Sequence, residues 1–341
     1  MSAELAEKLT LYLRRELAAP DLSVHDLSRI PGGASRETYR LRARFTRAGA
    51  AVERKLILRR DPPASLIETE RSVEFRAYQA FFALGFPVPE PVALETQGIV
   101  LERPFFIMGE IEGAQAASVL APDPYGSQRE EVGRQFWTTL GRIAAVDPIA
   151  LGLGDFDGAK RVENCWSHEL ARWEKVLDED ELEPQPIARA ALRWLKRHPP
   201  PPAQKIALVH GDYRSGNFLS DAEGRIRAVL DWEMAHLGDP LEDLAWALDP
   251  LWAHHDPSRP GGMLPRAQSL ALWERESGLK AEPQALFWWE VFASFKGLAI
   301  WISAAKEFAS GTNPDPVNAF SGWYCLAFHN QVLAQKLGAR A

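Results

Sequence analysis

Two short segments near the middle of the chain each place an aspartate directly after an apolar run. Residues 208–212 read L-V-H-G-D and residues 229–231 read V-L-D, so Asp212 and Asp231 are expected at the exposed ends of two buried strands. Asn217 follows the first aspartate by five positions. Carboxylate and amide oxygens are hard ligands of the kind that Mg²⁺ prefers. The set therefore favours metal-assisted phosphoryl transfer.

These three polar residues suggest one base and two metal ligands. Asp231 can bind a metal ion through its carboxylate, and Asn217 can bind it through its amide oxygen. Asp212 is then predicted to be the catalytic base that accepts the proton of an acceptor hydroxyl. In a loose transition state that proton is lost late, so a carboxylate of ordinary basicity suffices. We expect the neighbouring His210 to be structural, with its ring hydrogen-bonded into the loop.

Each aspartate taken alone has a simpler interpretation, namely that it caps the turn after a strand. The spacing to Asn217 and the later sequence G-D-P-L-E-D-L, residues 238–244, favour the catalytic interpretation. Within this sequence Asp239 precedes Pro240 and is expected to cap a helix. Asp243 is expected to bind backbone amides or to have another structural role.

The residues before about 110 predict a small β-rich unit. Leucines recur every four residues from Leu5 to Leu17, which predicts an amphipathic N-terminal helix. The sequence I-P-G-G-A-S near residue 30 is typical of a turn. The predicted strands span residues 38–42, 55–59, 92–94, 99–102 and 105–108, and a further helix is predicted over residues 73–84.

The remainder is predicted to be helical, apart from the two strands that carry Asp212 and Asp231. Helix 284–309 is apolar almost all round, which predicts a buried core helix that also forms one wall of an acceptor cleft. Lys296 within it is expected to extend to the surface. The predicted helices span about residues 128–146, 166–177, 186–197, 241–253, 266–277, 284–309 and 318–337.

Composition is that of an ordinary globular protein. The chain has 341 residues, 46% of them hydrophobic and 25% charged, which is enough for a large core and two lobes. A net charge of −7 argues against nucleic acid as a partner, and no apolar run reaches the length of a membrane span. Cys165 and Cys325 are the only cysteines, so a reducing cytoplasmic location is expected.

The motif segments resemble a known enzyme family. H-G-D-x-x-x-x-N, followed by L-D-W-E, G-D-P and D-L-A, is similar to the pattern of the aminoglycoside phosphotransferase family, whose fold is similar to that of protein kinases. P-G-G-A-S-R-E-T-Y, L-I-L-R-R-D-P-P and D-W-E resemble more closely the bacterial branch related to the kinase-like domains of certain acyl-CoA dehydrogenases. The resemblance covers about residues 28–330.

This resemblance implies an α+β, two-lobed protein-kinase-like fold. A small β-rich N-lobe with one helix, residues 1–110, would carry the phosphate-covering loop and the interlobe hinge. A larger helical C-lobe, residues 111–341, would carry the catalytic loop, the metal site and the acceptor cleft. The implied cofactors are ATP, with GTP as the alternative, and Mg²⁺.

The resemblance also implies two backbone elements that bind the nucleotide. The phosphate-covering loop consists of small residues, which let backbone N–H groups approach phosphate oxygens, although a plain turn is the alternative interpretation. The hinge backbone would bind adenine. The loop residues are Gly32, Gly33, Ala34 and Ser35, and the hinge residues are Met108, Glu110 and Ile111.

Arg59 stands where kinases carry a phosphate-pairing lysine, and an arginine can also neutralise phosphate through its fork of donors. The competing Arg60 falls on the opposite face of the strand because side chains alternate. The carboxylate partner of Arg59 is implied at Glu74, with Glu70 one helical turn earlier as the alternative.

Two further groups of residues have two interpretations each. His254, His255 and Asp256 could form a metal cluster, but adjacent histidines in a proline-rich loop are expected to face solvent. Arg214 and Glu233 flank the predicted catalytic positions, and each either contacts phosphate or acceptor or forms a structural ion pair.

The predicted reaction is the ATP-dependent, Mg²⁺-assisted phosphorylation of a hydroxyl group, and the expected partners are a nucleotide and a small hydroxylated acceptor. A pseudokinase-like module that binds a nucleotide or acyl ligand without turnover is the alternative, and only the arginine at position 59 favours it. A metal-dependent hydrolase is a third hypothesis, which lacks a convincing histidine ligand cluster.

The identity of the acceptor stays open at this point. The family includes kinases of antibiotics, choline-like amines, sugars, homoserine and hydroxyacyl thioesters. The acidic excess of the C-lobe favours a cationic acceptor. Its aromatic residues, with all twelve tryptophans from Trp137 onward, favour an acyl or aromatic alcohol instead. The sequence does not indicate the oligomeric state.

Overall fold

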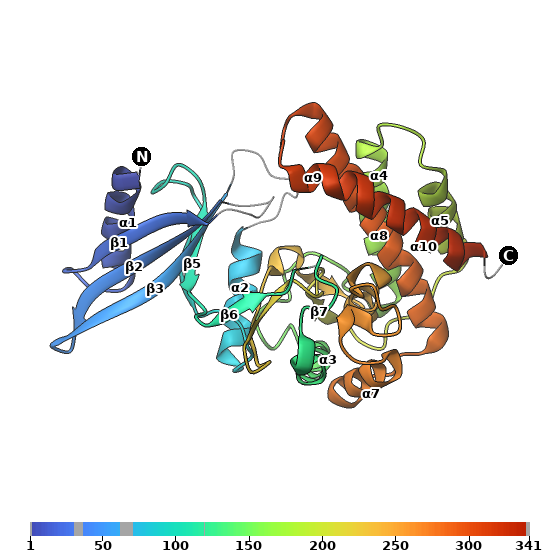
Figure 1. The fold of residues 1–341 in the computed structure, drawn as a ribbon, viewed down its shortest axis with the longest axis horizontal. Helices are drawn as coiled ribbons and strands as arrows, with labels where there is room; N and C mark the ends of the chain where they lie inside the picture. Colours follow the sequence, from blue (N-terminus) through green and yellow to red (C-terminus); the bar gives the residue numbers. More distant parts are fainter. Residues whose placement is uncertain (1, 31–36, 62–70, 119, 339–341) are drawn as a thin grey trace. The chain divides into compact units, whose positions relative to one another are not determined.

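The computed structural model describes residues 2–30, 37–61, 71–118 and 120–338. The chain divides into two compact units, unit 1 with Met1–Glu112 and unit 2 with Gly113–Ala341. The sequence places this boundary after residue 110. Figure 1 labels the helices and strands of both units.

Unit 1 is built on an antiparallel sheet with the strand order β1-β2-β3-β5-β4. Leu9 and Leu13 of the first helix pack with Leu41, Leu56 and Phe105 of the sheet in one hydrophobic core. The elements of unit 1 are α1 (Ser2–Glu16), β1 (Ser23–Ile30), β2 (Glu37–Arg47), β3 (Ala50–Arg60), α2 (Arg71–Ala83), β4 (Pro91–Glu95) and β5 (Phe105–Gly109).

Sequence reasoning finds most of this sheet but errs at two places. Residues 99–102 form a turn rather than a strand, because Gly98 and Glu102 have left-handed φ values of 70° and 64°. The apolar pattern there reflects Leu101, which is buried in the core although it lies in a turn. The edge strand β1 was not predicted, because its sequence S-V-H-D-L-S-R-I is largely polar.

Unit 2 combines many helices with two small antiparallel sheets, β10-β7 and β6-β8-β9. Its strands are β6 (Ala114–Ala116), β7 (Ala207–Val209), β8 (Phe218–Asp221), β9 (Ile226–Val229) and β10 (His236–Gly238). Its α-helices are α3 (Arg129–Ala145), α4 (Cys165–Asp180), α5 (Pro186–Arg197), α6 (Leu241–Ala247), α7 (Arg266–Ser277), α8 (Pro283–Ser310), α9 (Pro316–Phe320) and α10 (Leu326–Gly338). Its single-turn segments are η1 (Gly126–Gln128), η2 (Val162–Asn164), η3 (Trp232–Met234), η4 (Pro250–Trp252), η5 (Pro260–Gly262) and the π-helical turn η6 (Ser321–Cys325).

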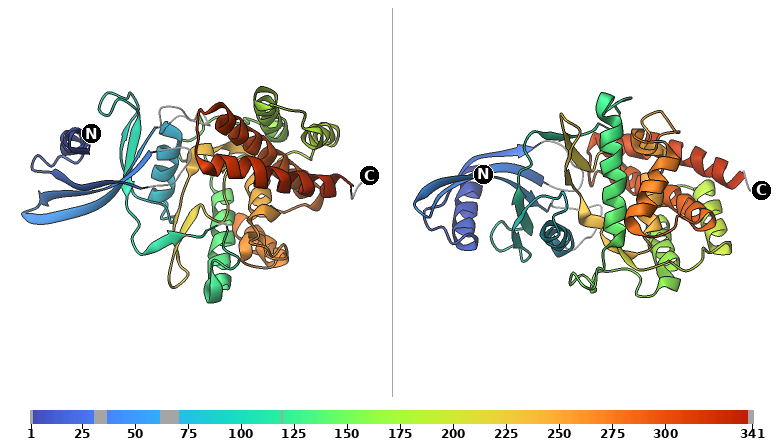
Figure 2. Two further views of the ribbon diagram at one scale, coloured as in Figure 1. Left: turned by 45° about the horizontal axis from the view of Figure 1, so that its top comes forward. Right: turned by 90° about the horizontal axis from the view of Figure 1, so that it is seen from below.

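Helix α8 forms the centre of unit 2. It contacts α4, α5, α6 and α10, and Figure 2 shows these helices gathered around it. By length and apolar composition alone this helix could cross a membrane, although the sequence analysis finds no membrane span. However, 78% of its most apolar window is buried inside the protein. The helix therefore has the environment of a core helix, as the sequence predicts.

Two predicted helices differ from the structure. The helix predicted over residues 241–253 ends at Ala247, because Pro250 disfavours a helical backbone at Asp249, whose ψ is 133°. The helix predicted over residues 318–337 begins earlier, as α9, and changes to the π-helical turn η6 before continuing as α10.

The buried Asp249 joins three segments of unit 2. Its carboxylate accepts hydrogen bonds from the backbone N–H of Leu251 in η4 (3.0 Å), Ser294 Oγ of α8 (2.7 Å) and His329 Nε2 of α10 (2.9 Å). Burial alone would raise the pKa of Asp249, but His329 and the hydrogen bonds hold it well below its usual range. His329 Nδ1 in turn accepts a hydrogen bond from Trp301 Nε1 (2.9 Å).

We predict that Gly297→Ala destabilises unit 2, because a Cβ at this position of α8 would overlap the ring of His329. That ring is fixed by Asp249 and Trp301 and cannot move away without breaking a buried hydrogen bond. Overpacking of this kind is expected to lower the free energy of unfolding by about 1–3 kcal/mol, measured by urea denaturation. The matched control is Gly338→Ala in α10, where nothing lies within 4 Å of the added atom. Equal stability of both variants would contradict the packing argument.

Candidate active site

The loop after β7 is fixed by the buried carboxylate of Asp243 on α6. Asp243 Oδ2 accepts a hydrogen bond from the backbone N–H of His210 (2.6 Å), and Oδ1 accepts one from that of Gly211 (2.9 Å). Burial raises the pKa of Asp243 to about 6, and these backbone bonds oppose the rise. The predicted binding of backbone amides by Asp243 is confirmed. Asp239, predicted as a cap, accepts from the backbone N–H of Leu241 (2.9 Å) in the first turn of the same helix.

His210 has a structural role, as its position in the motif predicts. Its Nε2 donates to the carbonyl of Leu230 (2.9 Å), and its Nδ1 accepts from the backbone N–H of Asp212 (3.1 Å). These two partners require a neutral ring with the proton on Nε2. Burial lowers the pKa of His210 to about 4, which keeps the ring neutral near pH 7. The ring therefore joins the two segments that carry the two aspartates.

Asp212 has a carboxylate whose direction is set by three donors. Its Oδ1 accepts from Arg214 Nε (3.0 Å) and Trp246 Nε1 (2.8 Å), and its Oδ2 accepts from Asn217 Nδ2 (2.5 Å). The side chain keeps 20% of its surface exposed. A carboxylate with two oxygens retains lone pairs beyond these three bonds. Asp212 is thus both oriented and accessible.

Asn217 and Asp231 lie at adjacent ends of the hairpin formed by β8 and β9. The pair Phe218–Val229 begins this hairpin, and the carbonyl of Asn217 accepts from the backbone N–H of Leu230 (2.8 Å). Asp231 follows with a left-handed backbone, φ 63° and ψ 54°, which turns the chain into η3. The structure therefore brings the two predicted metal ligands and Asp212 into one small region of unit 2.

The donor chemistry of these residues suits a hard divalent cation. Because a carboxylate only accepts hydrogen bonds, Asn217 must direct its NH₂ group toward Asp212 and its carbonyl oxygen the other way. That oxygen and the half-buried carboxylate of Asp231 are the ligand types that Mg²⁺ binds. Their role as metal ligands stays a prediction.

Lys296 is buried beneath the loop after β7, so the prediction that it extends to the surface is wrong. Only 1% of this residue is exposed, and its Nζ donates to the carbonyl of Gly211 (2.7 Å) and to Glu242 Oε1 (3.0 Å). Its ammonium group also lies 5.4 Å from the ring centroid of Trp246. The sequence around Lys296 does not indicate these partners, because both lie far from it along the chain.

The charge of Lys296 belongs to a buried network that sequence reasoning missed. Glu242 Oε2 lies 3.0 Å from His236 Nε2, and Glu169 Oε1 lies 3.6 Å from the same nitrogen. Burial alone would lower the pKa of His236, but the two carboxylates raise it to about 9. The pKa of Glu242 is lowered to about 2, because Lys296 and His236 outweigh its burial. Ligand atoms of the two glutamates and the histidine lie within 4.8 Å of one another, yet protonated side chains already balance their charge.

In unit 1 the strand and the helix of the predicted nucleotide site are joined by a buried ion pair. Arg59 on β3 donates through Nη1 to Glu74 Oε1 on α2 (2.6 Å). Arg60 lies on the other face of the strand and pairs with Glu37 (2.6 Å), as strand alternation predicts. The implied pairing of Arg59 with Glu74 is therefore present, and contact of Arg59 with phosphate stays a prediction. The alternative partner Glu70 lies outside the described residues.

The predicted hinge begins at the end of β5, an inner strand of the same sheet. Met108 is 7% exposed and pairs with Ile57 in β3. The backbone N–H of Glu110 donates to the carbonyl of Lys55 (3.0 Å), so the carbonyl of Glu110 and the N–H of Ile111 are the better candidates to contact adenine. The predicted phosphate-covering residues, Gly32, Gly33, Ala34 and Ser35, lie outside the described residues.

Two secondary candidates have structural partners in unit 2. Arg214 forms the ion pair with Asp212, and its guanidinium carbon lies 4.6 Å from the ring centroid of Trp252. His254 is buried, and its Nε2 lies 2.8 Å from Ser215 Oγ, so the expectation of a solvent-facing side chain is wrong there. The expectation is correct for the neighbouring His255, which is exposed.

Comparison with known proteins identifies relatives of this arrangement. A model of the phosphotransferase enzyme family matches residues 26–279. Acyl-CoA dehydrogenase family member 11 of Gallus gallus is 30% identical over 194 residues, which make up 56% of this chain and 24% of that protein. The chain thus spans about a quarter of the length of such curated relatives. These matches confirm the predicted resemblance.

Solved structures share the fold. A Ralstonia eutropha protein, solved as a candidate aminoglycoside phosphotransferase, has a TM-score of 0.73 at 22% identity and covers 97% of this chain and 98% of its own. A thermostable mutant of aminoglycoside phosphotransferase APH(4)-Ia, in ternary complex with ADP and hygromycin B, has a TM-score of 0.60 at 19% identity, with 98% and 99% covered. The predicted α+β, kinase-like fold is confirmed.

We predict that the buried network makes stability depend on pH between about 6.5 and 9. The pKa of His236 is raised from 6.5 to about 9, so its contribution is complete below pH 6.5 and is lost as the pH rises through 9. The free energy of unfolding should fall over this range by on the order of 3 kcal/mol, measured by urea denaturation at each pH.

The variant His236→Gln should remove most of this slope, because it has no proton to lose. The matched control is His168→Gln, a partly exposed histidine whose Nδ1 lies 3.3 Å from Oε1 of the same Glu169. If the pH dependence of the free energy of unfolding survives in His236→Gln and disappears in His168→Gln, the titrating residue is His168, and the assignment to His236 is wrong.

Proposed function

The chain belongs to the phosphotransferase enzyme family, and on this premise we propose that it transfers the γ-phosphoryl group of ATP to a hydroxyl group of a small molecule. The observation that carries the proposal is the clustering of Asp212, Asn217 and the Asp231 segment, with Asp212 oriented by three donors. The structural relative solved with ADP and hygromycin B supports a nucleotide and a small acceptor as ligands.

In the proposed reaction Asp212 is the base. Its carboxylate accepts the proton of the acceptor hydroxyl as the new O–P bond forms and the bond between the β- and γ-phosphates breaks. Arg214, Trp246 and Asn217 keep the carboxylate in one direction, so little reorganisation is needed during transfer. This positioning is the main contribution that a protein can make to phosphoryl transfer.

Asn217 and Asp231 would hold Mg²⁺ through an amide oxygen and a carboxylate. When bound, the ion would neutralise charge on the phosphate oxygens. In unit 1 we assign contact with the phosphates to Arg59, which is paired with Glu74, and contact with adenine to the hinge backbone, chiefly the carbonyl of Glu110 and the N–H of Ile111. GTP is the alternative nucleotide.

A binding module without turnover is the second candidate, and the arginine at position 59 in place of lysine favours it. A thermal-shift titration with Mg·ATP, followed by an ATP-consumption assay, separates the two candidates. Binding with turnover supports the transferase, and binding alone supports the module.

We expect Asp212→Asn to lower kcat for phosphate transfer by about 10²–10⁴-fold, because the amide cannot accept the proton. The affinity for Mg·ATP should stay within a few-fold of wild type, measured by calorimetric titration. The matched control is Asp256→Asn, a partly exposed aspartate that caps Ser258 and should leave kcat unchanged. Transfer at the wild-type rate by Asp212→Asn would exclude Asp212 as the base.

Asp231→Asn is expected to weaken nucleotide binding only when Mg²⁺ is present. Asparagine tolerates the left-handed backbone of this position, so the variant removes the charge and keeps the turn. Because loss of even an outer-shell partner costs about 10–100-fold in metal affinity, loss of a ligand should cost at least as much. Nucleotide titrations with Mg²⁺ and with EDTA measure the difference. An unchanged Mg²⁺ dependence would refute the metal role.

A further inference from the structure

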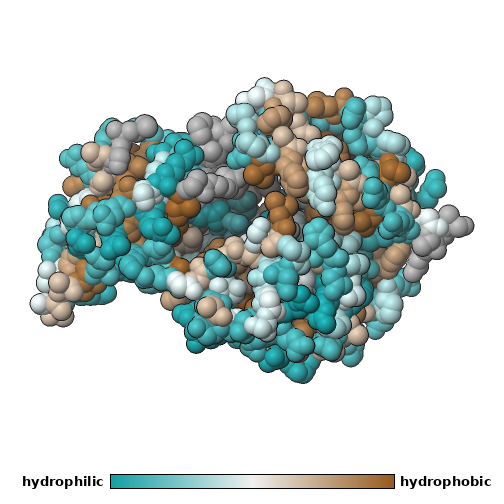
Figure 3. Space-filling view, in the orientation of Figure 1, coloured by the Kyte–Doolittle hydropathy of each residue, from teal (hydrophilic) through white to brown (hydrophobic). Residues whose placement is uncertain are grey.

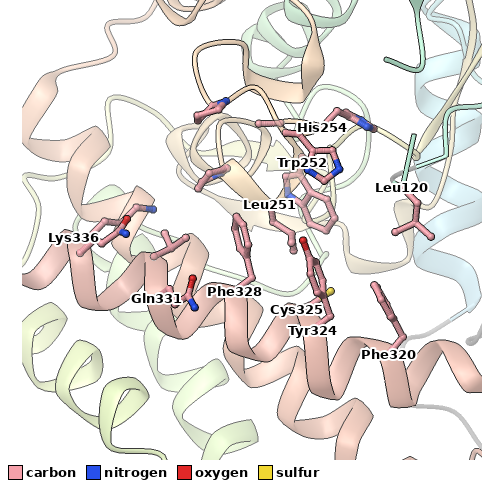
Figure 4. Close-up of a pocket in the computed structure, with 16 residues that line it drawn as sticks. Leu120, Leu251, Trp252, His254, Phe320, Tyr324, Cys325, Phe328, Gln331 and Lys336 are labelled. Atoms are coloured by element: carbon pink, nitrogen blue, oxygen red, sulfur yellow. The ribbon is translucent and has the colours of Figure 1, made fainter. Parts of the chain in front are cut away.

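Unit 2 contains a pocket of about 500 Å³ that adjoins the catalytic loop. Figure 4 shows aromatic side chains of η6 and α10 on one side of it and the η4 segment on the other. The π-helical turn η6 contributes Tyr324 and Cys325 to the wall, and π turns often mark functional sites. The apolar and aromatic part of the lining consists mainly of Leu251, Trp252, Phe320, Tyr324, Phe328 and Val332.

The pocket wall is in contact with the residues that orient Asp212. The ring of Trp252 packs against the guanidinium of Arg214, with 4.6 Å between the guanidinium carbon and the ring centroid, and against Trp246 (5.3 Å between ring centroids). Arg214 and Trp246 both donate to Asp212 Oδ1. His254, also in the lining, is bonded to Ser215 of the same loop. Through Trp252 and His254 the pocket therefore lies next to the segment that carries the proposed base.

The charges at the pocket do not suit a cation. Among the sixteen described residues that line it, none is an aspartate or a glutamate. Lys336 is the lysine of this set, and its Nζ is bonded to the carbonyl of Glu290 (2.7 Å) and to Ser294 Oγ (2.9 Å). Arg214 already covers a face of Trp252, so a ligand ammonium there would meet a like charge. Burial lowers the pKa of His254, which keeps that lining side chain neutral near pH 7.

Part of the rim of the pocket is also apolar, beside the exposed polar residues His255, Gln331 and Gln335. Phe320 and Tyr324 are 37% and 40% exposed, and the adjacent Trp323 is 74% exposed. In Figure 3 brown and tan atoms gather over the part of unit 2 where Figure 1 labels α9. The acidic excess of unit 2, which suggests a cationic acceptor in the sequence, is thus not located at this site.

From these observations we propose that the body of the acceptor occupies this pocket, and that the acceptor is an alcohol with an apolar alkyl or aryl body and without a cationic group. The proposal rests on the proposed phosphotransferase function. A polyamine would bury ammonium groups without carboxylate partners, which is unfavourable, whereas an apolar chain gains from leaving water. The aromatic cue of the sequence therefore outweighs the acidic cue.

The test uses three alcohols of one length: 1-octanol, 8-hydroxyoctanoate and 8-amino-1-octanol. Binding is measured by calorimetric titration of the full chain without nucleotide, and transfer is measured with Mg·ATP labelled at the γ-phosphate. We expect 1-octanol to bind at least about tenfold more tightly than the amino alcohol. Equal or tighter binding of the amino alcohol would overturn the proposal.

A charge variant tests whether the difference arises in this pocket. Gln331→Glu places a carboxylate in the lining at an exposed position of α10, and it should reduce the preference for 1-octanol over 8-amino-1-octanol by at least about fivefold. The matched control is Gln268→Glu on the exposed face of α7, which should leave the preference unchanged. An unchanged preference in Gln331→Glu would overturn the proposal.

Failure of the pocket and failure of the reaction give different results. If 1-octanol binds more tightly but no labelled phosphate is transferred to any of the three alcohols, the pocket binds apolar alcohols and its role in phosphoryl transfer is wrong. Transfer that favours 8-amino-1-octanol would retain the phosphotransferase function and overturn the pocket assignment.

Discussion

The carboxylate of Asp243 determines the geometry of the loop after β7, which carries Asp212. Buried backbone N–H groups are costly unless they are paired, and those of His210 and Gly211 have no strand partner at this point. Asp243 binds both, Lys296 binds the carbonyl of Gly211, and the His210 ring binds the carbonyl of Leu230. The backbone on which Asp212 stands is thus held by side chains of helices rather than by a sheet.

Holding a loop in this way requires charge in the interior, and unit 2 balances that charge locally. Unpaired buried ions are strongly destabilising, whereas a paired network is tolerated. Glu169, His236, Glu242 and Lys296 provide two carboxylates and two cations within one cluster. The cluster ties α4 and α8 to α6, the helix that carries both Asp243 and Trp246. The stability of unit 2 and the geometry around Asp212 therefore depend on the same contacts.

The sequence predicts what local patterns encode and fails where burial depends on distant partners. The sequence predicts the three grouped site residues, Asp212, Asn217 and Asp231, because they follow strand ends and are close together along the chain. Lys296 meets Glu242 across 54 positions, and His254 meets Ser215 across 39, so neither contact leaves a local trace. The early end of α6 could have been predicted from the sequence, because Pro250 disfavours a helical backbone at the residue before it. The shape and charge of the pocket come from η4, η6 and α10 together, which is why composition alone gave opposing indications of the acceptor.

The π-helical turn η6 gives this pocket a means to diversify. A π-helical turn contains one residue more than an α-helical turn, so a one-residue change in length can be absorbed there while the helix that follows keeps its register. The bond between His329 and Asp249 anchors α10 just after the turn. A single insertion or deletion at η6 could therefore redirect Tyr324 and Cys325 while the helical core stays in register. Such changes in length would alter the pocket without altering the residues around Asp212.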